Sequence, residues 1–230
     1  MRKILLIISL VAMISASSNA QTKNSRIGIK SGPTVNWASP GSTAANNGGL
    51  GLGVNVGLVY DYYFSSNMAI SSGLDMNLYR MKYMFTDYRF VDDFLEKTNI
   101  SVDRRLKAAN IGIPVKLKLN VGIVEPFKAY VEAGSTLSIN LKDYAMDSYN
   151  FYWVSSNGEE YVDCTNQYHL MQLSMVFGLG AEYAINRNVS VFAQLTLDHA
   201  TSNVFVSTLE KQTGSVIRNN FIGLEIGILY

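Results

Sequence analysis

The stretch Phe221–Tyr230, FIGLEIGILY, alternates between two kinds of side chain. One set is apolar and consists of Ile222, Leu224, Ile226, Ile228 and Tyr230. The other set is mostly small or charged and consists of Phe221, Gly223, Glu225, Gly227 and Leu229. Successive side chains of a β-strand point to opposite faces, so this stretch predicts a strand with one apolar face.

The same two-residue rhythm recurs along the chain. It is clear in residues 50–58 and 111–119, and weaker in about 26–37, 68–81, 128–141, 169–184 and 189–200. The side chains opposite the apolar set are too polar for the core of a β-sandwich, although a soluble secreted sandwich is the main competing fold. The pattern predicts an all-β fold, an eight-stranded antiparallel up-and-down transmembrane β-barrel.

The connections between the predicted strands alternate in length. Short links cover residues 63–67, 121–127 and 185–188, and long links cover 38–49, 82–107, 142–168 and 201–217. If the chain enters from the periplasm, every short link is periplasmic and every long link is external, as in outer-membrane barrels. Closure of such a meander leaves no free strand edge in the hydrocarbon.

The N-terminus has the three parts of a secretory signal peptide. Met1-Arg2-Lys3 is followed by an apolar run from Ile4 to Ile14 and by Ser18-Asn19-Ala20 as a cleavage site. We expect a signal peptide at residues 1–20, a mature barrel domain at 21–230 and a location in the bacterial outer membrane. Cleavage leaves 210 of the 230 residues and, by removing Arg2 and Lys3, changes the formal net charge from +1 to −1. A nearly neutral chain does not suggest nucleic acid as a partner, and the single cysteine, Cys164, cannot form an internal disulfide.

Charged residues recur at the inward positions of the predicted strands. They form a polar lumen set of Lys30, Asp75, Lys116, Lys118, Glu132, Glu182 and Glu225. An eight-stranded barrel encloses a space just wide enough for side chains to fill. We therefore expect a charge-paired interior and not a conducting pore.

Four segments carry a resemblance to a known family. They are residues 27–32 (IGIKSG), 109–117 (ANIGIPVKL), 129–134 (AYVEAG) and 176–183 (VFGLGAEY). Together they resemble the PorT-type outer-membrane β-barrel family, in which Pro114 matches a recurrent proline of the fourth strand. The resemblance implies an exported eight-stranded barrel, and some members of the family take part in protein secretion.

The C-terminal strand resembles a second known element, the β-signal read by the barrel-assembly machinery. The residues that match are Phe221, Leu224, Ile226, Ile228 and the terminal Tyr230. The resemblance implies that this machinery is a partner during biogenesis, alongside outer-membrane lipid as the surrounding solvent.

The long links combine aromatic and basic residues, which are enriched at protein interfaces. The candidate outer-loop contacts are Tyr88, Arg89, Phe90, Arg104, Arg105, Tyr149, Tyr152 and Trp153. Aromatic residues close to strand ends fit the girdles at the membrane boundary, and these are Tyr60, Tyr62, Tyr79, Tyr83, Tyr183 and Tyr230. Residues 92–97 are predicted to form a short helical turn.

The sequence contains no diagnostic catalytic, cofactor or metal-ligand spacing. His169 and His199 are the two histidines, and an enzyme would need Asp198 or Asp163 to orient one of them, with Ser207 or Thr201 as nucleophile. Adjacent parity places Asp198 and His199 on opposite faces. Cys164 with the two histidines lacks the spacing of a metal motif.

We therefore expect no catalytic, cofactor-binding or metal-binding residues. The leading hypothesis is a non-enzymatic barrel, structural or partner-binding, and its sharper version is an accessory of protein secretion or envelope organisation. The alternatives are an enzyme that acts on lipid or peptide at the external rim, and a small channel or lipid-binding barrel.

Overall fold

The computed structural model describes residues 24–230, except 44, 88–99, 152–153, 158–160 and 206–215. Its elements are almost all strands. In chain order they are β1 (Ser25–Pro40), β2 (Ala45–Asn47), β3 (Leu50–Tyr63), β4 (Met68–Asp87), β5 (Ile100–Val124), β6 (Phe127–Phe151), β7 (Val154–Asn157), β8 (Val162–Asp163), the 3-10 turn η2 (Thr165–Gln167), β9 (Met171–Ala184), β10 (Ser190–Ala200) and β11 (Ile217–Leu229).

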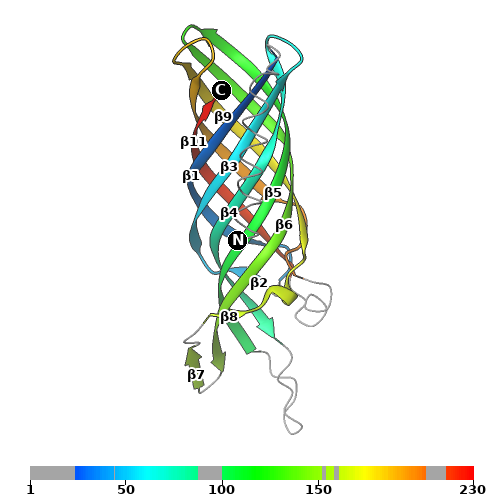
Figure 1. The fold of residues 1–230 in the computed structure, drawn as a ribbon. Coiled ribbons are helices and arrows are strands. Elements are labelled where there is room, and N and C mark those ends of the chain that lie inside the picture. Colours follow the sequence, from blue (N-terminus) through cyan, green and yellow to red (C-terminus); the bar gives the residue numbers. More distant parts are fainter. Residues whose placement is uncertain (1–23, 44, 88–99, 152–153, 158–160, 206–215) are drawn as a thin grey trace, which may run out of the picture.

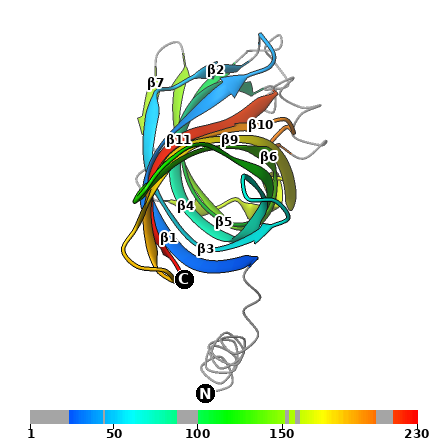
Figure 2. The ribbon, with the colours of Figure 1, turned by 90° about the horizontal axis from the view of Figure 1, so that it is seen from above.

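Eight of these strands form one closed antiparallel barrel. The order of neighbours is β4, β3, β1, β11, β10, β9, β6 and β5, and β5 pairs again with β4. The first and last strands join where Gly28 faces Leu229, and the backbone groups of Ile27 and Tyr230 exchange two hydrogen bonds of 3.0 and 2.7 Å. Figure 2 shows the closed ring from one end. The predicted fold class is confirmed.

The two ends of the barrel differ, as Figure 1 shows. At one end β3–β4, β5–β6 and β9–β10 are joined by short turns, and the C-terminus lies there too. At the other end β4, β5 and β6 continue beyond the ring, with β2 paired to β4 and β7 and β8 paired to β6. We call the short-turn end periplasmic and the other end external, in line with barrels of this architecture.

The external connections are shorter than the sequence indicated. β5 and β6 are each 25 residues long, whereas about 10 residues of a tilted strand cross a bilayer. Much of the predicted loops 82–107 and 142–168 is therefore paired β-structure. Beyond residue 82 the sequence pattern does not indicate strands, because most inward positions there, such as Tyr83, Phe85 and Leu106, are apolar like the outward ones.

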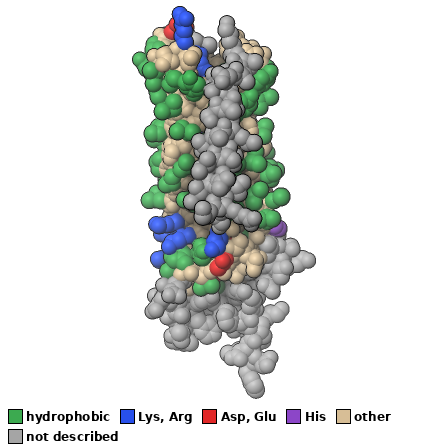
Figure 3. Space-filling model, viewed as in Figure 1, with side chains coloured by type: hydrophobic (Ala, Val, Ile, Leu, Met, Phe, Trp, Pro, Cys, Tyr) green, Lys and Arg blue, Asp and Glu red, His purple; other side chains and the backbone are tan. Residues whose placement is uncertain are grey.

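The wall of the barrel follows the predicted two-residue rhythm. Side chains that point outward are apolar and exposed, among them Leu52, Leu78, Val115, Phe177 and Ile226. Figure 3 shows hydrophobic side chains along the flanks of the barrel. An exposed apolar band around a closed sheet is suited to lipid and not to water.

Two backbone irregularities interrupt the regular pairing of the strands. Pro114 faces inward and has no N–H to donate, and the pairing of β4 with β5 is interrupted between the Ser72–Val115 and Asp75–Gly112 pairs. On β6 the register with β5 shifts at Asn140 and Lys142, so that Leu141 is an extra residue. This bulge makes Lys142 point outward and Asp143 inward.

Glycines on the inner face give large side chains room. A methyl group at Gly180 would fall against the ring of Tyr130, and one at Gly227 would lie 2.5 Å from the ring of Phe192. Both aromatic residues are buried. The small residues of the alternating pattern are thus explained by packing inside the barrel.

Two predicted segments lie entirely outside the described residues. These are the signal peptide at residues 1–20, including its apolar run, and the helical turn at residues 92–97. Within the described part of the chain, no helix is long and apolar enough to cross a membrane.

Candidate functional site

The periplasmic half of the lumen is built around Lys118 of β5. Its ammonium group donates to Asp61 Oδ2 at 2.7 Å and to Glu182 Oε1 at 2.5 Å. Glu182 also accepts a hydrogen bond from Arg26 at 3.1 Å. The Tyr130 ring lies 4.2 Å from the Lys118 nitrogen. Lys118, Asp61 and Glu182 are almost fully buried, so these charges are stabilised by one another and not by water.

A second group of ion pairs occupies the middle of the lumen. Lys30 of β1 donates to Asp75 at 2.9 Å and to both oxygens of Glu225 at 3.2 Å. Lys116 pairs with Glu132 on the neighbouring strand. All seven residues of the predicted lumen set are thus inside the barrel and paired.

Neutral side chains connect the ion pairs. Gln194 donates to Glu132 and Thr196, and it accepts a hydrogen bond from Tyr130 at 2.9 Å. Thr196 in turn donates to Glu225 at 3.2 Å. Asp61, which the predicted set omitted, could have been found because Tyr60 and Tyr62 on either side of it point outward.

Small cavities lie between the described side chains of the lumen. Two cavities, of about 20 and 10 Å³, lie among the inward side chains. A cavity of that size holds about one water molecule. A larger depression of about 990 Å³ is lined mainly by outward apolar side chains such as Ile29, Val56 and Leu74, so we assign it to the lipid-facing wall.

An aromatic plug closes the external end of the lumen. It consists of buried aromatic and aliphatic side chains, namely Met81, Tyr83, Phe85, Val102, Leu106, Tyr168, Phe205 and Ile217. The rings of Tyr83, Phe85 and Phe205 lie 5.7 to 6.0 Å apart, and two of the three contacts are edge-on. The prediction that Tyr79 and Tyr83 belong to a girdle is wrong, because both face the interior and are buried.

Arg104 of β5 lies inside this plug. Its guanidinium group makes two 2.6 Å hydrogen bonds to the Asp147 carboxylate and a third, also of 2.6 Å, to Gln167. The Tyr168 hydroxyl lies 3.3 Å away and the Phe85 ring centroid 5.0 Å away. Although burial disfavours the charge, Tyr83, Tyr168 and Asp147 raise the pKa of Arg104. The prediction that Arg104 is an external contact is wrong: it is 2% exposed, because it is an inward residue of β5 and not part of a loop.

The segment from Cys164 to Tyr168 seals the plug from the side. The Cys164 N–H donates to the Asp143 carbonyl at 2.9 Å, and the Asp143 N–H donates to the Thr165 hydroxyl at 3.1 Å. Burial raises the pKa of the Cys164 thiol to about 12. Burial also raises the pKa of the Asp143 carboxyl to about 6, and the hydrogen bond from Asn140 partly offsets this. A thiol with so high a pKa is a poor nucleophile.

Of the other predicted outer-loop contacts, the structure describes the side chain of Arg105 alone. Arg105 points outward and is exposed, next to the buried Arg104. Tyr88, Arg89, Phe90, Tyr152 and Trp153 lie outside the described residues, and the side chain of Tyr149 is not described either. The C-terminal set is on the surface, except for Phe221, which has the inward parity of β11.

The histidines do not form a catalytic arrangement with the described residues. His199 points outward on β10, while Asp198 points inward and accepts a hydrogen bond from Ser174 at 2.9 Å. The Thr201 hydroxyl donates to the Leu173 carbonyl, and Ser207 is outside the described residues. Within the described ranges, no three His, Cys, Asp or Glu side chains lie close enough together to hold a metal ion.

These features define a class of protein. An apolar outer wall, closed strand pairing, short periplasmic turns and a charge-paired lumen are those of an integral outer-membrane β-barrel. The chain belongs to the family described as "Outer membrane protein beta-barrel domain", whose sequence profile matches residues 18–206. Membership of this family indicates the bacterial outer membrane as its location. No curated protein matches the chain.

Solved structures with a similar arrangement include several outer-membrane proteins. Ail, the attachment invasion locus protein of Yersinia pestis, is 12% identical with a TM-score of 0.36, and the match covers 90% of this chain and 99% of Ail. The outer membrane protease OmpT from Escherichia coli is 11% identical with a TM-score of 0.47, covering 90% and 96%. OprG from Pseudomonas aeruginosa is 10% identical with a TM-score of 0.41, covering 90% and 95%. At these identities and scores the three proteins indicate nothing about the activity of this chain.

Proposed function

We propose that this protein is a non-enzymatic outer-membrane barrel that binds another envelope protein through its external extension. The external extension comprises β4 after Lys82, β5 before Arg105, β6 after Lys142, and β7 and β8. The observation that carries the proposal is the continuation of paired strands well beyond the apolar band. Strands of this length are not needed to cross the membrane.

The extension is built as a rigid surface. Arg104 and Asp147 are directly opposite each other on β5 and β6, and their two-point pairing joins these strands inside the plug. Bidentate arginine–carboxylate pairs are strong and fix geometry. A surface that is ordered before binding loses less conformational entropy when a partner binds.

The filled lumen supports a role on the surface and not in conduction. The charged side chains are paired across the barrel, and the aromatic plug covers them on the external side. For an eight-stranded barrel this is the expected state of an interior without a pore. Planar-bilayer recording should therefore detect no discrete conductance, and a stable single-channel step would contradict this part of the proposal.

Site-specific photo-crosslinking tests the contact directly. A benzophenone amino acid at Val162, 66% exposed on β8, should yield one discrete adduct in intact cells. The matched control is Val124, 77% exposed at the periplasmic end of β5, which should not yield that adduct. Mass spectrometry then identifies the partner. The proposal fails if Val162 yields no adduct that Val124 lacks.

A sharper form of the proposal is a secretion accessory. It rests on the PorT-type resemblance of residues 27–32, 109–117, 129–134 and 176–183. Deletion of the gene should then lower the amount of secreted protein in the medium while other outer-membrane proteins stay at normal levels. Unchanged secretion would leave the general envelope role and exclude this form. Cleavage after Ala20 and delivery by the barrel-assembly machinery remain predictions.

A further inference from the structure

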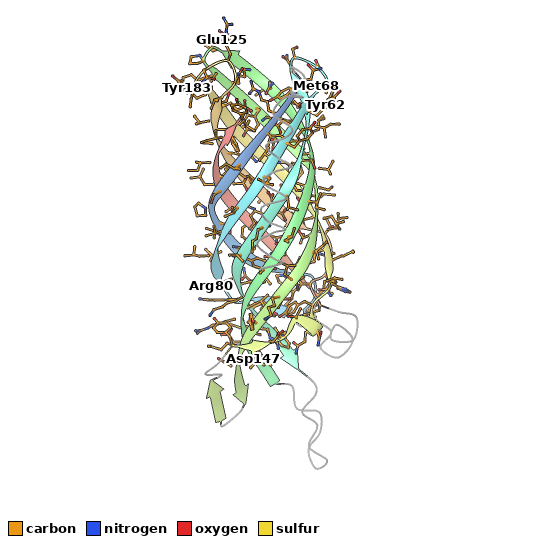
Figure 4. The ribbon with its side chains drawn as sticks, viewed as in Figure 1. Tyr62, Met68, Arg80, Glu125, Asp147 and Tyr183 are labelled. Carbon is orange, nitrogen blue, oxygen red and sulfur yellow. The ribbon has the colours of Figure 1, made fainter. Side chains whose placement is uncertain are left out.

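Five basic side chains stand together on the outer face of β4, β5 and β6. This basic cluster consists of Arg80, Lys82, Arg105, Lys107 and Lys142. Four of them are exposed and Lys107 is half-buried. In Figure 3 Lys and Arg side chains gather on one flank of the barrel, at the end of the hydrophobic band. Figure 4 shows Arg80 at this level, projecting from the wall.

The register of the strands places like charges opposite each other. Arg80 faces Lys107. Lys82 faces Arg105 in the next pair on the same face, two residues further toward the external end. Directly opposed like charges on neighbouring strands destabilise a sheet. The bulge on β6 adds Lys142 to the same face, opposite Ala109. An anion bound between the two pairs would offset their repulsion.

Among the residues that the structure describes, few acidic side chains lie near the basic cluster. No ion pair between described residues includes a member of the basic cluster. The described acids nearby are Asp103, two residues from Arg105 on the same face, and Asp163, which interacts with Lys142. Lys107 and Lys142 lie over the rings of Tyr161 and Tyr144, which are uncharged contacts. Counted over the described residues, five basic and two acidic side chains leave this surface with a net positive charge.

An apolar groove adjoins the basic cluster on its membrane side. The groove has a volume of about 440 Å³, and Arg80, Lys107 and Lys142 line it together with Leu52, Val54 and Leu78. Leu52 and Leu78 are 69% and 48% exposed. Apolar and cationic surfaces thus meet at the height where the lipid-facing band ends, which is the headgroup level of the outer leaflet.

We propose that this groove binds a phosphorylated lipid of the outer leaflet, with its phosphate on Arg80 and Lys107 and an acyl chain along Leu52, Val54 and Leu78. Arginine and lysine form charge-assisted hydrogen bonds to phosphate. A free phosphate ion would satisfy the charges but leave the apolar part of the groove uncovered. A lipid with a phosphorylated headgroup and an acyl chain matches both the basic and the apolar part of the groove.

The test uses the folded full-length barrel in neutral detergent, with lipid A as the probe. Native mass spectrometry should show lipid A retained on the wild type, and the double variant Arg80→Gln/Lys107→Gln should bind it at least tenfold more weakly. The matched control, Lys128→Gln/Arg187→Gln, removes the same charge at the periplasmic end and should bind as the wild type does. Equal binding by all three proteins would overturn the proposal.

Further measurements exclude simpler explanations. Without lipid, the Arg80→Gln/Lys107→Gln variant should melt at a higher temperature than the wild type, because a repulsive pair is gone. Added lipid A should then raise the melting temperature of the wild type and leave that of the variant unchanged. If dephosphorylated lipid A binds equally well, or if inorganic phosphate alone stabilises the wild type as much, the groove is not a site for a phosphorylated lipid.

Discussion

Replacement of Lys118 by methionine tests whether the lumen is held together by paired charges. Asp61 is fully buried, and Lys118 is its one hydrogen-bond partner among the described side chains, at 2.7 Å. Glu182 would keep Arg26 at 3.1 Å. The variant therefore leaves one buried carboxylate without a counter-charge, which costs roughly 3 to 5 kcal/mol. A loss of about 4 kcal/mol lowers the ratio of folded to unfolded protein about a thousandfold.

Urea unfolding in lipid vesicles measures this loss. Trp37, half-buried on the outer face of β1, reports by fluorescence, and migration on unboiled gels reports the closed barrel independently. The double variant Lys118→Met/Asp61→Asn removes the orphaned charge and should recover at least half of the lost stability. Arg187→Met, in an exposed turn, should have no effect. A Lys118→Met protein within about 0.5 kcal/mol of wild type, the range of surface substitutions, would refute the reasoning.

Three further predictions concern packing and titration. Gly180→Val should cost about 1 to 3 kcal/mol in the same unfolding assay, because the new side chain meets the Tyr130 ring; a neutral result would contradict the packing argument. Cys164 should react with maleimide at pH 8 only after unfolding, because burial raises its pKa to about 12; rapid labelling of folded protein would show that the plug is open. The Asp143 pKa of about 6 lies above the ordinary value of 3.8, so the folded state binds its proton more readily, and this contribution to stability is present at low pH and lost as the pH rises through 6. The gain in melting temperature from pH 7 to pH 5 should therefore be smaller in Asp143→Asn than in the wild type, and an equal gain in both would exclude Asp143 as its source.

Most of what could be predicted from the sequence follows from strand parity, the alternation of inward and outward positions along each strand. It placed Lys30, Asp75 and Glu225 inside the barrel, although Asp75 lies 45 residues and Glu225 lies 195 residues from Lys30 in the chain. It also placed Asp198 and His199 on opposite faces. Parity does not reveal Arg104, because the segment 82–107 contains apolar residues on both faces of the strand and reads as a long link.

The identity of the partners inside the lumen could not be predicted. Lys118 pairs with Asp61 and Glu182, from β3 and β9, which are not neighbours of β5 in the barrel. Such contacts run across the interior and depend on how the strands are staggered when the sheet closes. The stagger of the strands cannot be predicted from the sequence of any one strand.

The sequence by itself determined which side chains face the lipid and which face the lumen. In any β-strand the side-chain direction alternates every two residues, whatever strands lie beside it. The tertiary structure alone decided the outer end of the barrel. The extra residue Leu141 on β6 reverses the parity of everything after it, so that Asp147 turns inward to Arg104 and Lys142 turns outward to the basic cluster. A bulge is a property of two paired strands, and it becomes visible only when both are in place.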